Sequence, residues 1–422
     1  MGENSSFSKD KLNHIDKKIV WILGKIHIML QWLIRQILKG SIRNILTINS
    51  LLKLLFLYSV TVLCIIVSYF DFSPGVFKKS SARKVAIYAV ENRIGEHQAY
   101  IRTLRALKKL GFEYVGAAYD ENLMNYISTR HFHIVAAYII NKICNPDVNI
   151  TLTHHVTILP PGYNLIYLNV PDVLLYNLEG KFLKKYQHLE NYDGYIDLYS
   201  FSNGDNKLLK EVLHNYDKDN VPIFTAYLAQ DEQKFIAPES YNNMVITGSM
   251  WGCNRGSYRF QDALQKLAQD KLFIAYGQAY AFDYLGEAYK GNVDRYGPAT
   301  EMLITLQRKE GIALVIHSLE HLLQGLPTSR FAEAIMSGSV MVVDNNSFIR
   351  KFFGDNVLYF DSFKGRDEIY EQLKSHIIWI RSHQKEASIM TKNAYDIFVK
   401  NLTLEIQLQK LMEQVDAFRA SR

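Results

Sequence analysis

From residue 84 onward, short apolar runs of strand length alternate with longer stretches in which apolar residues recur at helical spacing. The run KVAIYAV (84–90) has the uninterrupted hydrophobic character of a strand buried in a parallel sheet. An amphipathic stretch, His97–Leu110, follows it and is ended by Gly111. This order predicts a strand followed by a helix that packs on it.

The same alternation continues through the first half of the chain. Further strand patterns are GFEYVGAAY (111–119), HIVAAYI (133–139), TLTHHVTIL (151–159), YNLIYLN (163–169), GYIDLYS (194–200) and PIFTAYLA (222–229). Strand alternation puts His154 and His155 on opposite faces, so this pair alone makes a poor metal site. Strands that alternate with helices predict a doubly wound parallel sheet over residues 84–240.

A second series of strands occupies residues 241–385. Its patterns are NMVITGS (243–249), LFIAYG (272–277), IALVIHS (312–318), SVMVVD (339–344) and NVLYFD (356–361). The predicted fold class is therefore α/β, with two doubly wound, Rossmann-like domains that face a cleft. We expect residues 386–422 to form a C-terminal helix that crosses back, and ligands to bind beyond the carboxyl ends of the strands.

The chain in front of these domains has a different pattern. Leu54–Phe70 contains no charged residue, and its 17 residues correspond to about 26 Å of helix. We predict a transmembrane helix over residues 51–72 and a linker over 73–83; a buried core helix is the alternative. Residues 1–50 form a basic amphipathic segment that suits a membrane surface, or else a hairpin partner for the apolar run.

Charge is divided unevenly between these regions. The net charge is +6, but residues 1–84 carry +9 and the remaining 338 residues carry −3. A nucleic-acid enzyme would spread Lys and Arg over its folded domains, so we expect no nucleic-acid partner. The basic front of the chain fits an anionic membrane surface instead.

The cysteines bear on the compartment. Three widely spaced cysteines supply neither a disulfide framework nor a zinc site, which favours a reducing compartment. We therefore expect a single-pass or peripheral membrane protein whose catalytic part is cytoplasmic.

Candidate chemistry concentrates in residues 312–361, where a strand, a Gly-Leu-Pro loop and a helix follow one another. Thr328 is a suitable N-cap, and with Ser329 it offers hydroxyls beside unpaired backbone N–H groups at the positive end of the helix dipole. Arg330 would add a contact to a phosphate, and Glu333 would reach ligand hydroxyls. The alternative is an ordinary strand-loop-helix-strand unit with a solvated Glu333.

This stretch closely resembles the donor-nucleotide region of GT-B glycosyltransferases of the retaining "group 1" class, which carry a Gly-Leu-Pro loop, a helix with Glu-Ala, a Gly and a Val-Val strand. The resemblance implies that Thr328 and Ser329 face the donor diphosphate and that Glu333 holds ribose hydroxyls. Further donor-binding positions implied by it are Gly248, Arg255 (followed by Gly256), Arg259 and Gly277. The likeness covers about residues 240–365 and extends to the first half only by architecture.

The sequence departs from this family at one position. The family has an acidic residue eight positions before the Glu of Glu-Ala, and this chain has Gly325 there. Retention or inversion at the sugar therefore stays open. No metal is expected, because Arg255 and the helix start can neutralise the diphosphate, and Asp217-Lys218-Asp219 is interpreted as a solvated turn.

An inverting reaction would need a base for the acceptor proton, and His97 and Glu91 are the candidates. The resemblance implies a glycosyltransferase that moves a sugar, without a cofactor, from a nucleotide diphosphate donor to a hydroxyl of a glycan, lipid-linked or protein acceptor. The apolar run and the basic front of the chain predict that this enzyme is membrane-anchored. The alternative is a catalytically inactive GT-B-like module that binds a nucleotide sugar or glycan at the membrane. A dinucleotide oxidoreductase or P-loop enzyme is disfavoured, because neither glycine motif occurs in its required context.

Overall fold

The computed structural model describes most of the chain from Phe70 to the C-terminus. The described ranges are 70–90, 94–119, 139–154, 159–168, 170–171, 174–198, 206–248, 260–291 and 299–422. Within these ranges no helix combines the length and apolar character that crossing a membrane requires. The surface segment predicted over 1–50 and nearly all of the membrane helix predicted over 51–72 lie outside the described residues.

The first domain is built on a seven-stranded sheet with the order β1-β3-β2-β4-β5-β6-β7. Its strands are β1 (Phe70–Phe72), β2 (Lys84–Val90), β3 (Glu113–Tyr119), β4 (Val148–Thr151), β5 (Asn164–Leu168), β6 (Gly194–Asp197) and β7 (Ile223–Thr225). All neighbours are parallel except β1, which runs antiparallel to β3. Because β1 begins at Phe70, the sheet includes three residues at the end of the range 51–72.

Helices of this domain follow the strands as the alternation predicts. They include α3 (Ile94–Lys109), the 3-10 helix η2 (Lys184–Asn191) and α7 (Lys207–His214), and residues 139–144 are helical as well. Gly111 follows α3 with φ of +73°, the left-handed conformation that favours glycine after a helix. Tyr100 of α3 packs over Gly116 of β3, where an added Cβ would lie 2.4 Å from the Tyr100 hydroxyl.

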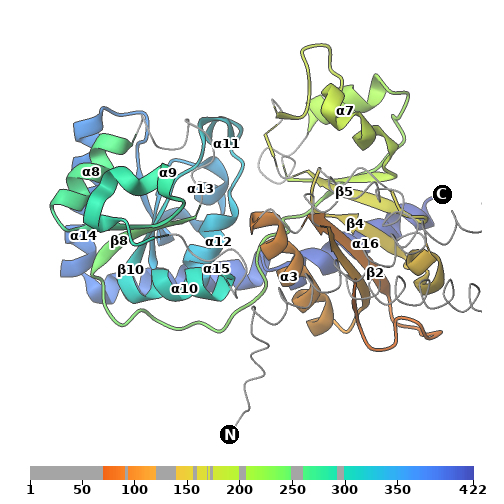
Figure 1. Ribbon diagram of the computed structural model, residues 1–422, viewed down its shortest axis with the longest axis horizontal. Coiled ribbons are helices and arrows are strands. Elements are labelled where there is room, and N and C mark those ends of the chain that lie inside the picture. Colours follow the sequence, from red (N-terminus) through yellow and green to blue (C-terminus); the bar gives the residue numbers. More distant parts are fainter. Residues whose placement is uncertain are drawn as a thin grey trace, which may run out of the picture. The chain divides into compact units, whose positions relative to one another are not determined.

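The second domain is built on a five-stranded, wholly parallel sheet with the order β12-β11-β10-β8-β9. Its strands are β8 (Asn243–Gly248), β9 (Phe273–Gly277), β10 (Gly311–Val315), β11 (Val340–Asp344) and β12 (Leu358–Phe360). Its helices are α8 (Gln261–Gln269), α9 (Ala279–Phe282), η3 (Asp283–Ala288), α10 (Ala299–Glu310), α11 (Leu319–Gln324), α12 (Ser329–Met336), α13 (Ser347–Phe353), η4 (Gly354–Asn356) and α14 (Arg366–Ser382). Both sheets and their helices are drawn in Figure 1.

Two C-terminal helices connect the domains. Helix α15 (Gln384–Asn401) packs on α12 and β11 of the second domain, whereas α16 (Leu404–Ala420) packs on α3 and β7 of the first. The Leu404 N–H donates a hydrogen bond of 2.8 Å to the Gln230 carbonyl. Gln230 belongs to residues 226–242, the interdomain linker between β7 and β8. The end of the chain therefore returns to the first sheet.

One predicted strand is wrong in its position. The pattern 151–159 predicts a strand through His154, but β4 occupies Val148–Thr151 and His154 lies in a turn. The last ladder contact is the hydrogen bond from Leu152 N–H to the Tyr88 carbonyl. The strand is set by its pairing with β2 and β5, a long-range constraint that the local alternation does not contain.

Candidate functional site

The candidate site lies at the carboxyl edge of the second sheet. Strand order reverses between β8 and β10, because β9 continues the sheet on one side and β11 on the other. At such a switch point the connections leave in opposite directions and open a crevice beyond the strand ends. The strands adjoining this point end at Gly248 and Val315.

Two candidate glycines meet at this edge. Gly248 ends β8, Gly277 ends β9, and the two are paired directly in the parallel register. The Gly277 N–H donates to the Gly291 carbonyl over 3.1 Å, and the Gly277 carbonyl accepts from the Tyr289 hydroxyl over 2.9 Å. The backbone of Gly277 is therefore fixed by protein contacts, and its predicted place beside a base stays a prediction.

Beyond β10 stands a buried histidine–aspartate pair that the sequence did not single out. The His317 ring Nδ1 lies 2.7 Å from Oδ1 of Asp344, and the His317 backbone N–H donates to Oδ2 over 2.8 Å. Since a carboxylate only accepts, Nδ1 carries the proton. Both side chains are fully buried, and His317 Nε2 has no hydrogen-bond partner in the described structure.

The Asp344 turn also fixes the Gly-Leu-Pro loop. Asn346, two residues after Asp344, donates from Nδ2 to the Leu326 carbonyl over 2.9 Å and accepts from the first N–H groups of α13 through Oδ1. His317 and the loop leading to Thr328 are thus tied to the same turn. The ends of β10 and β11 and the start of α12 consequently form one connected edge.

The start of α12 has the features of an anion site. Thr328 occupies the N-cap position with φ of −99° and ψ of 156°, and its side chain makes no capping hydrogen bond. The Thr328 residue is only 7% exposed, and its Oγ1 has no partner in the described structure. A buried free hydroxyl beside the unsatisfied N–H groups of a helix start leaves donors for an anionic group.

Behind this helix start lies an ion cluster that joins the domains. Glu333 of α12 is completely buried, and its Oε1 accepts from Nη2 of Arg102 on α3 over 2.7 Å. Its Oε2 accepts from Nη1 of Arg330 over 2.5 Å. Glu333 is therefore engaged on both oxygens by arginines, and its predicted contact with ribose hydroxyls stays a prediction.

The cluster keeps its carboxylate charged. Burial by itself would raise the pKa of Glu333, but the charges and hydrogen bonds of Arg330 and Arg102 outweigh it and hold the pKa below its usual range. A buried carboxylate that stays ionised needs such partners. Arg330 is the member nearest to solvent, with 18% of its side chain exposed, compared with 1% for Arg102.

The candidate base His97 lies in the first turns of α3. Its ring stacks on Tyr100 with a centroid separation of 6.2 Å, and the Tyr100 hydroxyl donates to Asp71 of β1 over 2.5 Å. Burial lowers the pKa of His97, and the nearby Asp71 carboxylate only partly opposes this. The imidazole is therefore neutral at physiological pH, the form that a base requires.

The remaining sequence candidates divide into two groups. Ser329 and Arg330 form the first turn of α12, as the sequence predicts. Glu91, Arg255 and Arg259 lie outside the described residues. No cluster of three or more potential metal-ligating side chains occurs within the described part of the chain.

The structure gives a physical reason for Gly325. It is the residue that ends α11, with φ of +65° and ψ of 25°. This left-handed conformation favours glycine, and an acidic residue there would be strained. Glu320, the nearest acidic residue in the sequence, lies in the first turn of α11 at the opposite end of that helix.

Comparisons with known proteins identify the fold. No protein-family model matches the chain, and no curated protein matches it. Among solved structures, sucrose-phosphate synthase from Thermosynechococcus elongatus is similar with a TM-score of 0.51 and 11% identity, covering 79% of this chain and 99% of that one. The UDP-forming α,α-trehalose-phosphate synthase from Burkholderia vietnamiensis has a TM-score of 0.51 and 9% identity, covering 82% and 99%.

A third structure, Anabaena HepE in complex with UDP-glucose, is similar with a TM-score of 0.50 and 11% identity, covering 79% of this chain and 99% of that one. The match to this chain covers 99% of each of these three structures. The predicted GT-B glycosyltransferase fold is therefore confirmed.

Proposed function

We propose that this protein is a glycosyltransferase that moves a sugar from a nucleotide diphosphate donor to a hydroxyl acceptor. The observation that carries the proposal is the start of α12, where the buried Thr328 hydroxyl is free and Arg330 reaches solvent, at the switch point of a GT-B fold. The solved structure of HepE contains UDP-glucose, which supports a nucleotide sugar as donor.

In this mechanism the protein stabilises the leaving diphosphate electrostatically. The N–H groups and dipole of α12, the Thr328 hydroxyl and the Arg330 guanidinium would bind phosphate oxygens as negative charge develops on them. Arg255, one of the sequence candidates, would add a second cation. These groups need no metal ion to neutralise the phosphate, so we propose that the reaction is metal-independent.

The acceptor side would be served by the first domain. If the reaction inverts the sugar centre, His97 would take the acceptor hydroxyl proton on its unprotonated ring nitrogen. A neutral, partly buried imidazole suits this role, and Glu91 is the other candidate. The acceptor is a glycan, lipid-linked or protein hydroxyl, and the basic N-terminal segment would hold the enzyme at a membrane with its catalytic part in the cytoplasm.

Two observations favour a second candidate, an inactive module that binds a nucleotide sugar or glycan. Gly325 replaces the acidic residue that the resemblance calls for, and Glu333 is wholly enclosed by protein. Such a protein would bind the donor without releasing its sugar.

A binding and turnover experiment tests both candidates. The full chain is incubated with UDP-, GDP- and ADP-sugars while thermal unfolding and release of the nucleoside diphosphate are measured. The active enzyme is expected to show a raised Tm with one donor and release of its diphosphate; a raised Tm without release indicates the binding module.

Replacing Thr328 by Val and Arg330 by Gln is expected to weaken donor binding by about tenfold each, because each removes a phosphate contact. Thr391→Val, a buried threonine of α15, is the matched control and should leave binding unchanged. If no donor raises the Tm, or if both site variants bind as the wild type does, the proposed function is wrong.

A further inference from the structure

We propose that Arg102 of the first domain is a positioning residue of the donor site in the second: it neutralises Glu333, so that Arg330 retains a positive charge for the diphosphate. This inference rests on the proposed function. It assigns a role to a residue of α3 that has no place in the sequence motifs of the donor site.

A continuous series of hydrogen bonds joins the two domains. Arg102 donates to Oε1 of Glu333 over 2.7 Å and, through Nη1, to the Ala229 carbonyl over 3.2 Å. Glu333 holds Arg330 on its other oxygen, three residues earlier on the first turn of α12. Figure 1 shows α3 beside α12, where this contact is made. Arg102 is thus fixed to the interdomain linker and to Glu333 at once.

The net charge of Arg102, Glu333 and Arg330 determines how this cluster acts on a diphosphate. Two guanidinium groups and one carboxylate carry a net charge of +1, whereas Arg330 and Glu333 alone would cancel. Burial strengthens this effect, because Glu333 and Arg102 are removed from water and its screening. Of the three side chains, Arg330 alone is more than a few per cent exposed, so the surplus charge is available at the start of α12.

Geometry adds a second effect. The Glu333 carboxylate is held by Arg102 on one oxygen, which fixes the position of the other oxygen, to which the guanidinium of Arg330 donates. A preorganised cation loses less conformational freedom when it binds a phosphate. Both effects predict that Arg102 governs the affinity for a diphosphate without contacting it.

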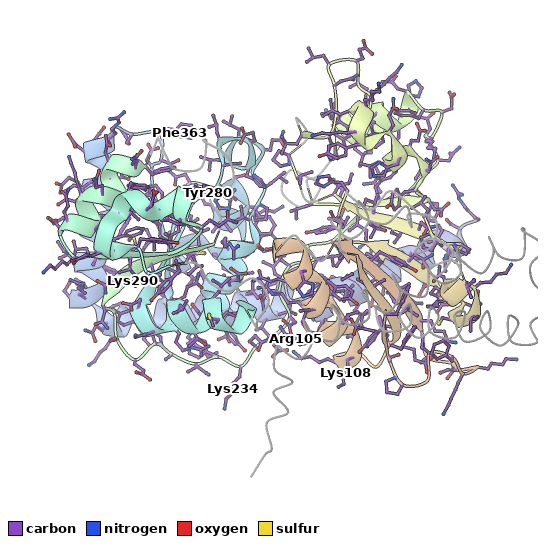
Figure 2. The ribbon with its side chains drawn as sticks, in the orientation of Figure 1. Arg105, Lys108, Lys234, Tyr280, Lys290 and Phe363 are labelled. Carbon is purple, nitrogen blue, oxygen red and sulfur yellow. The ribbon has the colours of Figure 1, made fainter. Side chains whose placement is uncertain are left out.

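Arg105 provides a matched control on the same helix. Its Nη2 donates to Oδ1 of the buried Asp231 over 2.9 Å, so it too joins α3 to the linker. Figure 2 labels Arg105 on α3 with the linker residue Lys234 nearby in the view. Arg105 shares the helix, the charge and a buried carboxylate partner with Arg102, but that partner is not on α12.

The experiment measures binding of two probes to the full-length protein by calorimetry. The probes are inorganic pyrophosphate and UDP, with GDP and ADP tested in the same way. We expect Arg102→Met to lower the affinity for both pyrophosphate and nucleotide about tenfold, because the donor site loses one positive charge. The dependence of this affinity on salt concentration should become weaker for the same reason. Arg102→Lys should restore most of the affinity, and Arg105→Gln should bind within twofold of the wild type.

A double variant separates charge from simple loss of folding. Arg102→Met combined with Glu333→Gln removes both buried charges and leaves Arg330 uncancelled, so pyrophosphate affinity should return towards the wild-type value. A contact of Glu333 with ribose would appear differently, as a loss confined to the nucleotides. Thermal unfolding of each variant identifies the samples that are folded at the binding temperature.

The outcomes distinguish a failure of this inference from a failure of the proposed function on which it rests. If the wild type binds neither pyrophosphate nor any nucleotide, the proposed function fails and this inference with it. If the wild type binds and folded Arg102→Met binds equally well, only the inference is overturned. It is also overturned if Arg105→Gln weakens pyrophosphate binding as much as Arg102→Met does.

Discussion

At the scale of single residues, the candidate site depends on polar groups that are buried and paired in one particular way. His317 is held by Asp344, and Glu333 is held by two arginines, while Thr328 Oγ1 and His317 Nε2 lack partners in the described structure. They are two of several buried side-chain atoms without a partner in the described structure. Because these two lie near the end of β10 and at the start of α12, they are available to the donor in the proposed function.

His97 gives a pH prediction at the same scale. Its pKa is lowered by burial, so the unfolded state binds the proton more readily than the folded state. The folded protein is therefore stabilised by keeping His97 neutral. This contribution to the free energy of unfolding is complete above pH 6.5, the usual pKa of histidine, and is lost as the pH falls from 6.5 through the lowered pKa. Between pH 7.5 and 5.5, the wild type should therefore lose more stability than His97→Gln in urea unfolding.

Activity should follow the same group if His97 is the base. Transfer should fall as the pH drops through the lowered pKa of folded His97, whereas His97→Gln should lose most of its activity at every pH. A wild-type rate that stays constant while an NMR titration shows His97 becoming protonated would exclude His97 as the base.

At the scale of elements, glycines set where α12 ends and how closely the linker passes it. Gly338 follows α12 with φ of +74°, and an added Cβ would lie 2.3 Å from the Ile236 carbonyl oxygen of the linker. The left-handed conformation and the close approach both require glycine here. The helix that carries Arg330 and Glu333 is thereby fixed against the segment that joins the domains.

Gly338→Ala is expected to destabilise the protein by about 2–4 kcal/mol, because it combines left-handed strain with a backbone clash. Gly111→Ala is the control, since Gly111 follows α3 with nearly the same φ, +73°, but has open space around its Cβ position. It should cost only about 1–2 kcal/mol, the backbone strain alone. Equal losses for the two variants in urea unfolding would contradict this account.

At the scale of the whole described molecule, one hydrophobic core extends through both sheets. It includes Val85 of the first sheet, Val343 of the second, Phe331 of α12 and Leu411 of α16, all fully buried. The returning helix α16 therefore closes the first domain while its neighbour α15 packs on the second. We therefore expect the two domains to unfold together.

Leu411→Ala is expected to destabilise both domains together, by about 2–5 kcal/mol, because it opens a cavity in the shared core. Hydrogen exchange should show faster global exchange for amides of β2 and β11 alike. Ile389→Ala is the control, since Ile389 is 62% exposed on α15 and should cost less than about 1 kcal/mol. Loss of protection in β2 alone would mean that the domains unfold independently.

The sequence alone determined most of the helices and strands and the α/β fold class. The strand at 84–90, the helix after it and the strand-loop-helix unit that begins its helix after Thr328 are confirmed, because apolar periodicity acts locally. Thr328 holds the N-cap position, but its side chain makes no capping hydrogen bond. The tertiary structure decided which charges meet: Arg102 and Glu333 are 231 residues apart in the chain, and His317, just after β10, meets Asp344 at the end of the neighbouring β11. Such pairs depend on how helices and strands pack, and a local pattern contains no information about that packing.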